Sequence, residues 1–514
     1  MPLAKFSQYS TIEPLLSKDM YPSWVPNQDD KLRCAAYDLY EQIYRNVPDA
    51  FEILQRGTEA DPIYLPSARK CIEATNRYLG VGFDYALVGG NDANRKVVGD
   101  ALGILFRREK FRAKFNSIKR FGLIKGDSLW HIVADPGAPQ GRRISLHELD
   151  PGSYFPIYDI DDTEKLLGVH IVAPYVDPQD KQKSLVKRQT YRKLDNGAGN
   201  SNTITSELTI FESDGWDDRQ LLVDDNYKLK PYKSLVKQFN LPPQITAIPV
   251  YHIANQYEGG LSFGLSDLSG FERVIAGLHQ AITDEELSLA LDGLGVYWST
   301  AAAPSGGWIM GPGSVVEGAD GEDFKRVSGV TNVSPFQDHL NFLNNEIKQA
   351  MGTPDIAIGN VDVQVAQSGI ALALQMGPII ARNSEKEDEL LAIQDHLLFD
   401  LINGWLPAYE GLPEFGIAAD PKFANPMPVD RDAVVKEVTT LLGTTPPIIS
   451  AEYARKILTE KLGYEFPDSM GDDIIAEIQA NSKARNFDPF AERIREELAG
   501  DFGEAGIATN IGAG

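Results

Sequence analysis

Apolar residues between positions 263 and 405 recur at helical spacing in three segments. The first segment carries an apolar residue at every third or fourth position: Leu268, Phe271, Ile275, Leu278 and Ile282. The second repeats that pattern: Phe336, Leu340, Leu343, Ile347 and Met351. Steps of three and four place such residues on one side of a helix, so both segments are predicted to be amphipathic helices.

The stretch between these two helices, residues 295–334, is rich in Gly, Ser and Val. This composition continues neither helix and predicts turns with short strands. A helix, a β insert and a returning helix form two stalks that carry a small tip. Because such a pair buries little surface by itself, we expect it to need neighbours, either elsewhere in the chain or in other copies of it.

Gly352 and the proline two residues later end the second helix abruptly, since glycine suits the position after a helix and proline cannot continue one. A loop of small, polar and acidic residues follows. The third helix is predicted from about Gln367 to Trp405. It is interrupted by Gly377 and Pro378, and a proline inside a helix removes one backbone hydrogen bond, which predicts a kink.

The rest of the chain divides by pattern. Residues 28–120 favour helices over 29–45, over 67–79 with Ser67 as a cap, and from about 91 towards 121. Residues 124–255 favour strands, at 129–133, 167–173, 185–191 and 208–211, with a mobile hairpin tip at 195–202. A Pro- and Gly-rich connection leads to about residue 429. Short helices follow at 431–442, 451–462 with Ser450 as a cap, 472–484 and 488–499.

Several short segments occur in a recognisable order: Lys125-Gly126-Asp127, Leu149-Asp150-Pro151, Phe155 to Asp159, Ile248-Pro249-Val250 with Asn255, Phe263 to Leu268, Gly352-Thr353-Pro354, Ile358-Gly359 and Ser368 to Leu372. Each is weak alone. In this order and spacing, the sequence resembles the portal proteins of tailed double-stranded DNA bacteriophages, in the form found in long-tailed phages of actinobacteria. The N-terminal and C-terminal parts resemble that family only in helical character.

The resemblance implies an α+β, multidomain portal fold assembled as a ring. Its parts would be a wing at 1–263 (helical first, then β-rich), a stem helix at 264–291, a clip at 292–334, a second stem helix at 335–351, a tunnel loop at 352–368, a kinked helix with the return to the wing at 369–429, an α-helical crown at 430–500 and a flexible tail at 501–514.

The function implied by the resemblance is that of a dodecameric ring at the unique capsid vertex, through which DNA is packaged and later ejected. The implied partners are other copies of the chain, double-stranded DNA bound without sequence preference, the large subunit of terminase, head-completion or adaptor proteins, and the major capsid and scaffold proteins. The chain would reside in the virion, and in the host cytoplasm during assembly.

The same resemblance suggests channel residues. The tunnel loop would present Asp355, Asn360, Asp362, Gln364 and Gln367 to the DNA. Candidate cationic contacts are Lys325 and Arg326 in the clip and Lys348 on the stem. Weak polar side chains suit transient contact with a moving duplex, because phosphate contacts carry no sequence information. The kink at Gly377 and Pro378 would let the loop shift.

The net charge of −24 over 514 residues bears on DNA binding. A strongly acidic chain is not expected to bind nucleic acids tightly, because the affinity comes largely from cationic side chains that neutralise phosphates. The default interpretation is a solvated acidic surface. For a portal, weak binding is an advantage, since a channel that held phosphates tightly would stall the moving DNA.

One segment is basic instead: Arg107, Arg108, Lys110, Arg112, Lys114, Lys119 and Arg120, with phenylalanines interleaved. On one continuous helix, Phe111 and Phe115 would share a face, as would Arg108 and Arg112. Either this is a wing helix packed by its phenylalanines and solvated by its charges, or it is a site for DNA or an acidic partner on the outside of the ring.

Motifs for catalysis are sparse in the sequence. It has no G-x-x-x-x-G-K-[ST] and no H-E-x-x-H, and its seven histidines are scattered. A G-x-S-x-G occurs at Gly260 to Gly264, in a loop before a predicted helix, and a short glycine pattern of this kind is weak evidence by itself. We therefore expect no catalytic residues, no metal and no cofactor. The two cysteines, Cys34 and Cys71, fit small buried hydrophobes in a reducing compartment. Neither a signal peptide nor a membrane span is evident.

Two other classes of protein stay open. One is a head-to-tail adaptor or a shell component that never touches DNA, although family adaptors are usually much shorter chains. The other is an enzyme that uses carboxylates of the α/β body as acid and base.

Overall fold

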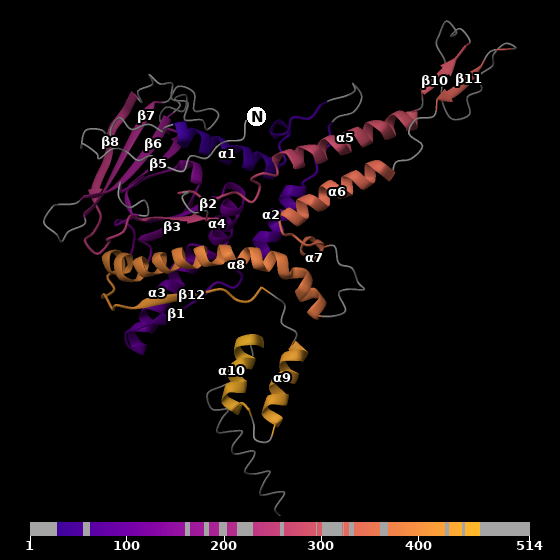
Figure 1. The fold of residues 1–514 in the computed structure, drawn as a ribbon. Helices are drawn as coiled ribbons and strands as arrows, with labels where there is room; N and C mark the ends of the chain where they lie inside the picture. The colour runs from indigo at the N-terminus through magenta and orange to yellow at the C-terminus, as the bar shows by residue number, and fades with distance from the viewer. Residues whose placement is uncertain are drawn as a thin grey trace, which may run out of the picture. The chain divides into compact units, whose positions relative to one another are not determined.

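The computed structural model describes residues 28–54, 62–159, 165–178, 185–194, 203–212, 230–257, 262–294, 296–300, 321, 323–327, 334–359, 369–426, 431–444 and 448–462. The chain divides into two compact units, Met1–Pro426 and Met427–Gly514. Helices and sheets are both present in the first unit, which confirms the α+β class (Figure 1). None of the helices described is both long and apolar enough to cross a bilayer.

In its described residues, the N-terminal part of the first unit contains the α-helices α1 (Gln28–Arg45), α2 (Ser67–Tyr78), α3 (Asp92–Arg108) and α4 (Phe111–Lys125). The prediction of a single helix from Asn91 to Phe121 is wrong. The chain breaks at Lys110, which has a left-handed φ of 53°. Ser67 is the first residue of α2 and not its cap, because the cap position belongs to Pro66.

The break at Lys110 has a packing reason. It lets Phe111 stack on Phe106 at 4.3 Å and on Trp130 at 5.3 Å between ring centroids. Phe111 and Phe115 are both buried and stack on each other, so their predicted shared face is confirmed. Burying these large rings in one cluster stabilises the corner more than an uninterrupted helix would.

The β-rich part contains two antiparallel sheets. One has the order β3 (Ile144–Leu149), β2 (Asp127–Ala134), β9 (Val250–Ala254). The other has the order β4 (Tyr154–Tyr158), β5 (Leu166–Tyr175), β6 (Leu185–Leu194), β7 (Thr203–Glu212), β8 (Lys230–Asn240). All four predicted strands are present. The predicted hairpin tip at 195–202 lies outside the described residues, between the paired strands β6 and β7.

Two strands that are far apart in the sequence pair with each other in the first unit. β1 (Asp84–Val88) pairs antiparallel with β12 (Ala418–Lys422). β12 follows a π-helical segment, Leu401–Glu410, which directly continues α8 (Gly369–Asp400). The helical run had been predicted to end at Trp405. Trp405 is instead a fully buried residue within that run.

The predicted stalk is present as an antiparallel helix pair, α5 (Glu272–Leu294) and α6 (Ser334–Ala350) (Figure 1). Between them β10 (Val296–Ser299) pairs with β11 (Phe324–Val327), which confirms the expected short strands. The first helix begins at Glu272 rather than at residue 264, and it ends at Leu294 rather than at residue 291. Turns precede it because Gly270 adopts a φ of +87° and the Ser266 hydroxyl binds backbone groups.

The second unit contains α9 (Arg431–Gly443) and α10 (Ala451–Leu462). Val434, Val438 and Ala454 are buried between them. The backbone N–H of Tyr453 donates to the Ser450 hydroxyl at 3.1 Å, so the predicted cap is confirmed. The helices predicted at 472–484 and 488–499, and the tail at 501–514, lie outside the described residues.

Two glycines bring the strand β2 against the approach to α5. A Cβ on Gly126 would lie 2.5 Å from the carbonyl oxygen of Gly264, and one on Gly264 would lie 2.3 Å from that of Gly126. Gly126 also has a φ of +93°. Only glycine fits such a close backbone approach. Both residues belong to the segments that carry the family resemblance.

We expect Gly126→Ala to destabilise the first unit by about 3 kcal/mol or more, because the new methyl group must displace backbone atoms and the left-handed φ strains it. The measurement is chemical denaturation followed by circular dichroism. Gly103→Ala is the matched control. It lies within α3 with no atom near its Cβ position, so it should stabilise the helix by up to about 1 kcal/mol. Equal effects of the two substitutions would contradict the close approach.

Candidate functional site

The candidate site is the base of the α5–α6 pair, where both helices meet α8. Just before α5, the backbone N–H of Asp267 donates to the carbonyl of Leu123 at 3.0 Å, and the Ser266 hydroxyl donates to that of Ile124 at 2.5 Å. These bonds join the turn before α5 to the end of α4. The direction in which α5 leaves the body is therefore set by α4 and the strand β2 that follows it.

The side chain of Asp267 is fully buried and ionically paired. Its carboxylate accepts from Lys386 Nζ at 2.5 and 2.7 Å, from Asn255 Nδ2 at 2.8 Å, and lies 3.4 Å from Arg382 Nη2. Burial alone would raise the pKa of this carboxyl, but Lys386 and Arg382 outweigh it and hold the pKa of Asp267 below its ordinary value. The carboxylate thus stays charged inside the unit.

Arg382 also holds the other helix of the pair. Its Nη1 donates to the carbonyl of Ala350 at 3.1 Å, at the last residue of α6. Gly352 follows with a φ of +59°, so the predicted helix end at this glycine is confirmed. One guanidinium therefore contacts both the turn that precedes α5 and the end of α6.

A second buried carboxylate, that of Asp127 on β2, is the centre of another hydrogen-bond network. Asp127 accepts from the backbone N–H of Gly264 at 2.8 Å, lies 2.7 Å from His252 Nε2, and accepts from the Tyr37 hydroxyl. Nearby, Lys125 Nζ donates to Asp150 at 2.8 Å. Three of the short segments that occur in recognisable order in the sequence thus meet here: Lys125-Gly126-Asp127, Leu149-Asp150-Pro151 and Phe263 to Leu268.

The segment after α6 begins with the short helix α7 (Asp355–Ile358). Lys348 Nζ donates to Asp355 Oδ1 at 2.6 Å. The structure therefore brings together two residues that had been predicted separately, one as a cationic contact and one as a loop carboxylate. The other predicted loop residues, Asn360, Asp362, Gln364 and Gln367, lie outside the described residues.

The hairpin carries the remaining predicted cations. Lys325 on β11 is exposed and forms an ion pair with Asp323. Arg326 lies opposite Tyr297 in the strand register, and its side chain is outside the described part of the structure.

Gly377 and Pro378 lie inside α8, in its N-terminal third. Figure 1 shows α8 changing direction in its N-terminal part. The carbonyl of Pro378 lies 3.7 Å from the Cβ position of Gly352. The predicted kink thus sits beside the end of α6, next to the residues that Arg382 holds.

The basic segment is divided by the break between α3 and α4. Arg108 donates to the carbonyls of Gly141 and Ile144, and Lys114 donates to Glu109 and to the carbonyl of Leu146. These cations therefore join α3 and α4 to the strand β3. The predicted common face of Arg108 and Arg112 is wrong, because the two residues lie on different helices.

The other members of the basic segment differ in exposure. Arg107, Lys110 and Arg112 are exposed. Lys119 is buried and donates to the carbonyls of Asn76 and Leu79, and burial lowers its pKa to about 8. The segment is thus partly a packing element and partly an exposed surface.

Sequence reasoning missed Arg382 and Lys386. A signal was present, because the third predicted helix has an apolar stripe at Leu390, Ile393, Leu397 and Leu401, and Lys386 lies on this stripe four residues before Leu390. A charged residue on a buried stripe requires a buried partner. The partner, Asp267, is 119 residues away, so no local pattern could identify it.

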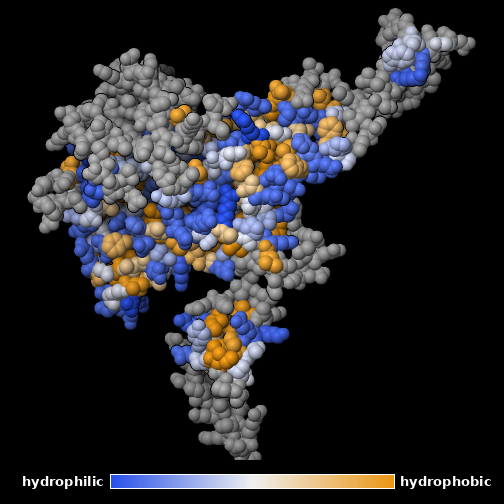
Figure 2. All heavy atoms as spheres, viewed as in Figure 1, coloured by the Kyte–Doolittle hydropathy of each residue, from blue (hydrophilic) through white to orange (hydrophobic). Residues whose placement is uncertain are grey.

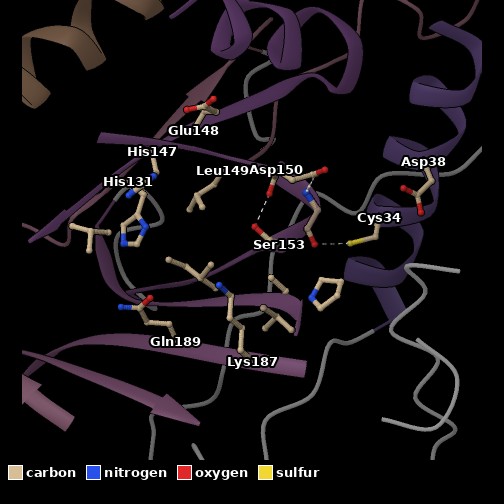
Figure 3. A pocket seen from close by; sticks show the side chains of 16 residues that line it. Cys34, Asp38, His131, His147, Glu148, Leu149, Asp150, Ser153, Lys187 and Gln189 are labelled. Atoms are coloured by element: carbon tan, nitrogen blue, oxygen red, sulfur yellow. Dashed lines mark hydrogen bonds between the residues drawn. The ribbon is translucent and has the colours of Figure 1, made fainter. Parts of the chain in front are cut away.

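A cavity of about 540 Å³ lies elsewhere in the first unit (Figure 3). Cys34 and Asp38 reach it from α1, His131 and His147 from the neighbouring strands β2 and β3, and Lys187 and Gln189 from β6. His131 Nε2 lies 3.0 Å from the Tyr191 hydroxyl. Burial, with His147 and Lys187 nearby, lowers the pKa of His131 to about 3.

No family model and no curated protein matches the sequence. Among solved structures, a chain of the virion of a native gene transfer agent particle matches with a TM-score of 0.41 and 14% identity over 84% of this chain and 94% of that one. A chain of the neck of the native particle, computed with C12 symmetry, matches with a TM-score of 0.40 and 13% identity over 78% and 96%. A chain of the neck of the empty particle, computed with C6 symmetry, matches with a TM-score of 0.40 and 15% identity over 77% and 90%.

We expect Lys386→Met to destabilise the first unit by about 3–5 kcal/mol, because it leaves a buried carboxylate without its closest cation. Asp267→Asn should also destabilise the unit, because it leaves the buried Lys386 ammonium without its carboxylate. The double variant should cost clearly less than the sum of the two single variants, since neither charge is then left unpaired. Denaturation of all four proteins measures this coupling. Additive losses would show that the two side chains do not interact.

Acid should destabilise the first unit through His131. Its folded pKa of about 3 lies below the unfolded value of 6.5, so the unfolded state binds more protons between these values and stability falls as the pH drops from 6.5 towards 3. One such histidine accounts for a loss on the order of 1 kcal/mol between pH 7.5 and 5.5.

Thermal unfolding at these two pH values tests this expectation. His131→Gln should show a smaller fall in midpoint than the parent protein, whereas His339→Gln, at an exposed position on α6, should behave like the parent. An unchanged pH dependence in His131→Gln would contradict a buried, neutral His131.

Proposed function

We propose that this protein is a portal protein of a tailed, phage-like particle. Copies of the chain form a ring at one capsid vertex, and double-stranded DNA passes through the ring during packaging and ejection. The observation that carries the proposal is the antiparallel pair α5–α6 with the β10–β11 hairpin at its far end (Figure 1). The short helix α7 and the proline-containing helix α8 follow it in the order that the sequence resemblance implies.

The surface of the helix pair supports assembly with other copies. Leu289 on α5 is 44% exposed and Phe342 on α6 is 57% exposed. Apolar side chains on a projecting helix pair are costly in water and are stabilised when neighbouring copies bury them. In a ring, each subunit uses one face to bind a different face of the next.

The channel would be lined from the segment after α6. In this proposal Asp355, Asn360, Asp362, Gln364 and Gln367 face the DNA. Because Lys348 is paired with Asp355, it adds little net positive charge there. A lining of this kind binds phosphates weakly, which suits a duplex that has to slide.

The hairpin is the proposed docking site for the large subunit of terminase, and later for head-completion or adaptor proteins. Trp298 on β10 is 51% exposed, and Lys325 on β11 is exposed beside it in register. Exposed tryptophan is enriched among the residues that dominate protein interfaces. Lys325 would add charge at the surface of Trp298.

Negative-stain electron microscopy with native mass spectrometry tests the ring. We expect end-on views with a central hole and side views with a stalk. Trp298→Ala should then weaken terminase binding at least about tenfold while rings still form. Tyr453→Ala, an equally exposed aromatic of the second unit, should leave binding unchanged. A compact small oligomer without a hole, persisting with capsid partners present, would contradict the proposal.

A further inference from the structure

Two exposed helix faces of the first unit carry opposite charge. The basic face begins on α2, where Arg69, Lys70 and Arg77 are exposed. On α4, Arg112 is exposed and Arg120 partly so, and their spacing of eight residues places them on the same side of the helix. α2 packs against α4 through Lys119, which donates to the carbonyl of Leu79. Figure 2 shows that hydrophilic and hydrophobic residues are mixed on the visible face of the first unit.

Glu73 is the carboxylate at the centre of this basic face. Arg120 Nε donates to it at 2.9 Å, the Tyr44 hydroxyl also donates to it, and the Arg69 guanidinium lies 5.7 Å from the Tyr44 ring centroid. Partial burial would raise the pKa of Glu73, but Arg120, Tyr44 and Arg69 together hold it below its ordinary value. The surface around Glu73 is therefore electropositive, although the chain carries a net charge of −24.

The acidic face lies on α8. Exposed residues recur along this helix at steps of three and four: Pro378, Ala381, Glu385, Asp388, Ala392, Asp395 and Phe399. Three of them are acids, and the small alanines between them allow another helix to approach closely. Phe399, at the end of the stripe, is 52% exposed. Such a face combines negative charge with an apolar anchor.

These two faces point in opposite directions. α8 packs on α2 through Asn383, whose Nδ2 donates to the carbonyl of Thr75 at 3.3 Å, and both residues are buried. At 3.6 residues per turn, Ala392 lies on the opposite side of α8 from Asn383. In the same way, Glu73 and Arg77 lie on the side of α2 opposite to Thr75. The basic and acidic faces are therefore on opposite sides of the packed α2–α8 pair.

We propose that the acidic face of α8 in one copy docks on the basic face of α2 and α4 in the next copy. Opposite charge on opposite sides of one unit is what a head-to-tail contact requires, whereas a two-fold contact would need one self-complementary patch. The proposal deepens the proposed ring by naming its two contacting surfaces. The partner is a second copy because the chain itself carries both complementary faces.

Charge reversal on each face provides the test. The basic-face variant is Arg69→Glu with Arg77→Glu, and the acidic-face variant is Glu385→Lys with Asp388→Lys. Each alone places like charges across the contact and should weaken self-association on the order of 100-fold. An equimolar mixture should associate again, because every contact in it then joins opposite charges. Sedimentation velocity and native mass spectrometry measure both effects.

A matched control changes the same charge at exposed positions away from the two faces. Lys96→Glu with Lys237→Glu should leave association unchanged, since these residues lie on α3 and β8. Circular dichroism confirms that each variant is folded. As a second measurement, association of the parent protein should weaken progressively as the salt concentration is raised from about 0.05 to about 1 M. The reason is that the Debye length shortens over this range, so the attraction between the two faces is screened.

The outcomes separate this contact from the proposed function. If both variants still associate like the parent, or if the mixture fails to associate, the contact is overturned, although rings seen by microscopy would still support a portal. If the mixture restores association but forms open chains or small oligomers, the proposed contact is supported and the proposed ring is overturned. If the basic-face variant loses DNA binding and not self-association, the basic face binds phosphates, and the contact is overturned.

Discussion

The buried carboxylate of Asp267 is the constraint on which the arrangement of the helices depends. A charge inside a protein has to be paired, and its partners here come from distant parts of the chain, with Lys386 and Arg382 on α8 and Asn255 after β9. Asp267 stands in the turn just before α5, and Arg382 reaches the last residue of α6. The start of α5 and the end of α6 are therefore both held at one place on α8. The close approach of Gly126 and Gly264 holds the turn before α5 against β2 as well.

Periodicity predicted the elements whose burial is one-sided. The helix at α6, the strands β5, β6 and β7 of the five-stranded sheet and the capped helix at α10 were predicted from local sequence, whereas β4 and β8 of the same sheet were not. Two boundaries were mispredicted for the same reason. At Lys110 and at the start of α5, long-range packing and side-chain bonds to distant backbone override a pattern that is locally helical. The aromatic stack of Phe106, Phe111 and Trp130 is not visible in any short window.

The candidate site was predictable only in part. Lys348 and Asp355 were both singled out, yet their pairing depends on the tight turn at Gly352. Arg108 and Lys114 looked like free surface charges, but carbonyls of the strand β3 and its approach accept from them. Arg69 and Arg77 were not predictable as part of a site, because two arginines eight residues apart are common on a single surface helix. Their importance appears only when α4 adds Arg120 beside Glu73.

The contact of one guanidinium with the turn before α5 and with the end of α6 has a mechanical consequence. α5 and α6 are stiff rods, and α6 alone spans about 25 Å at the rise of an α-helix. With the base pinned at Arg382, a sideways push on the hairpin cannot be absorbed by sliding of the rods and reaches the base as torque. The element that receives it is α8 next to Pro378, where one backbone hydrogen bond is already missing. The helix pair would therefore pass a force on the hairpin to α8, through Arg382 and through the Lys386–Asp267 pair.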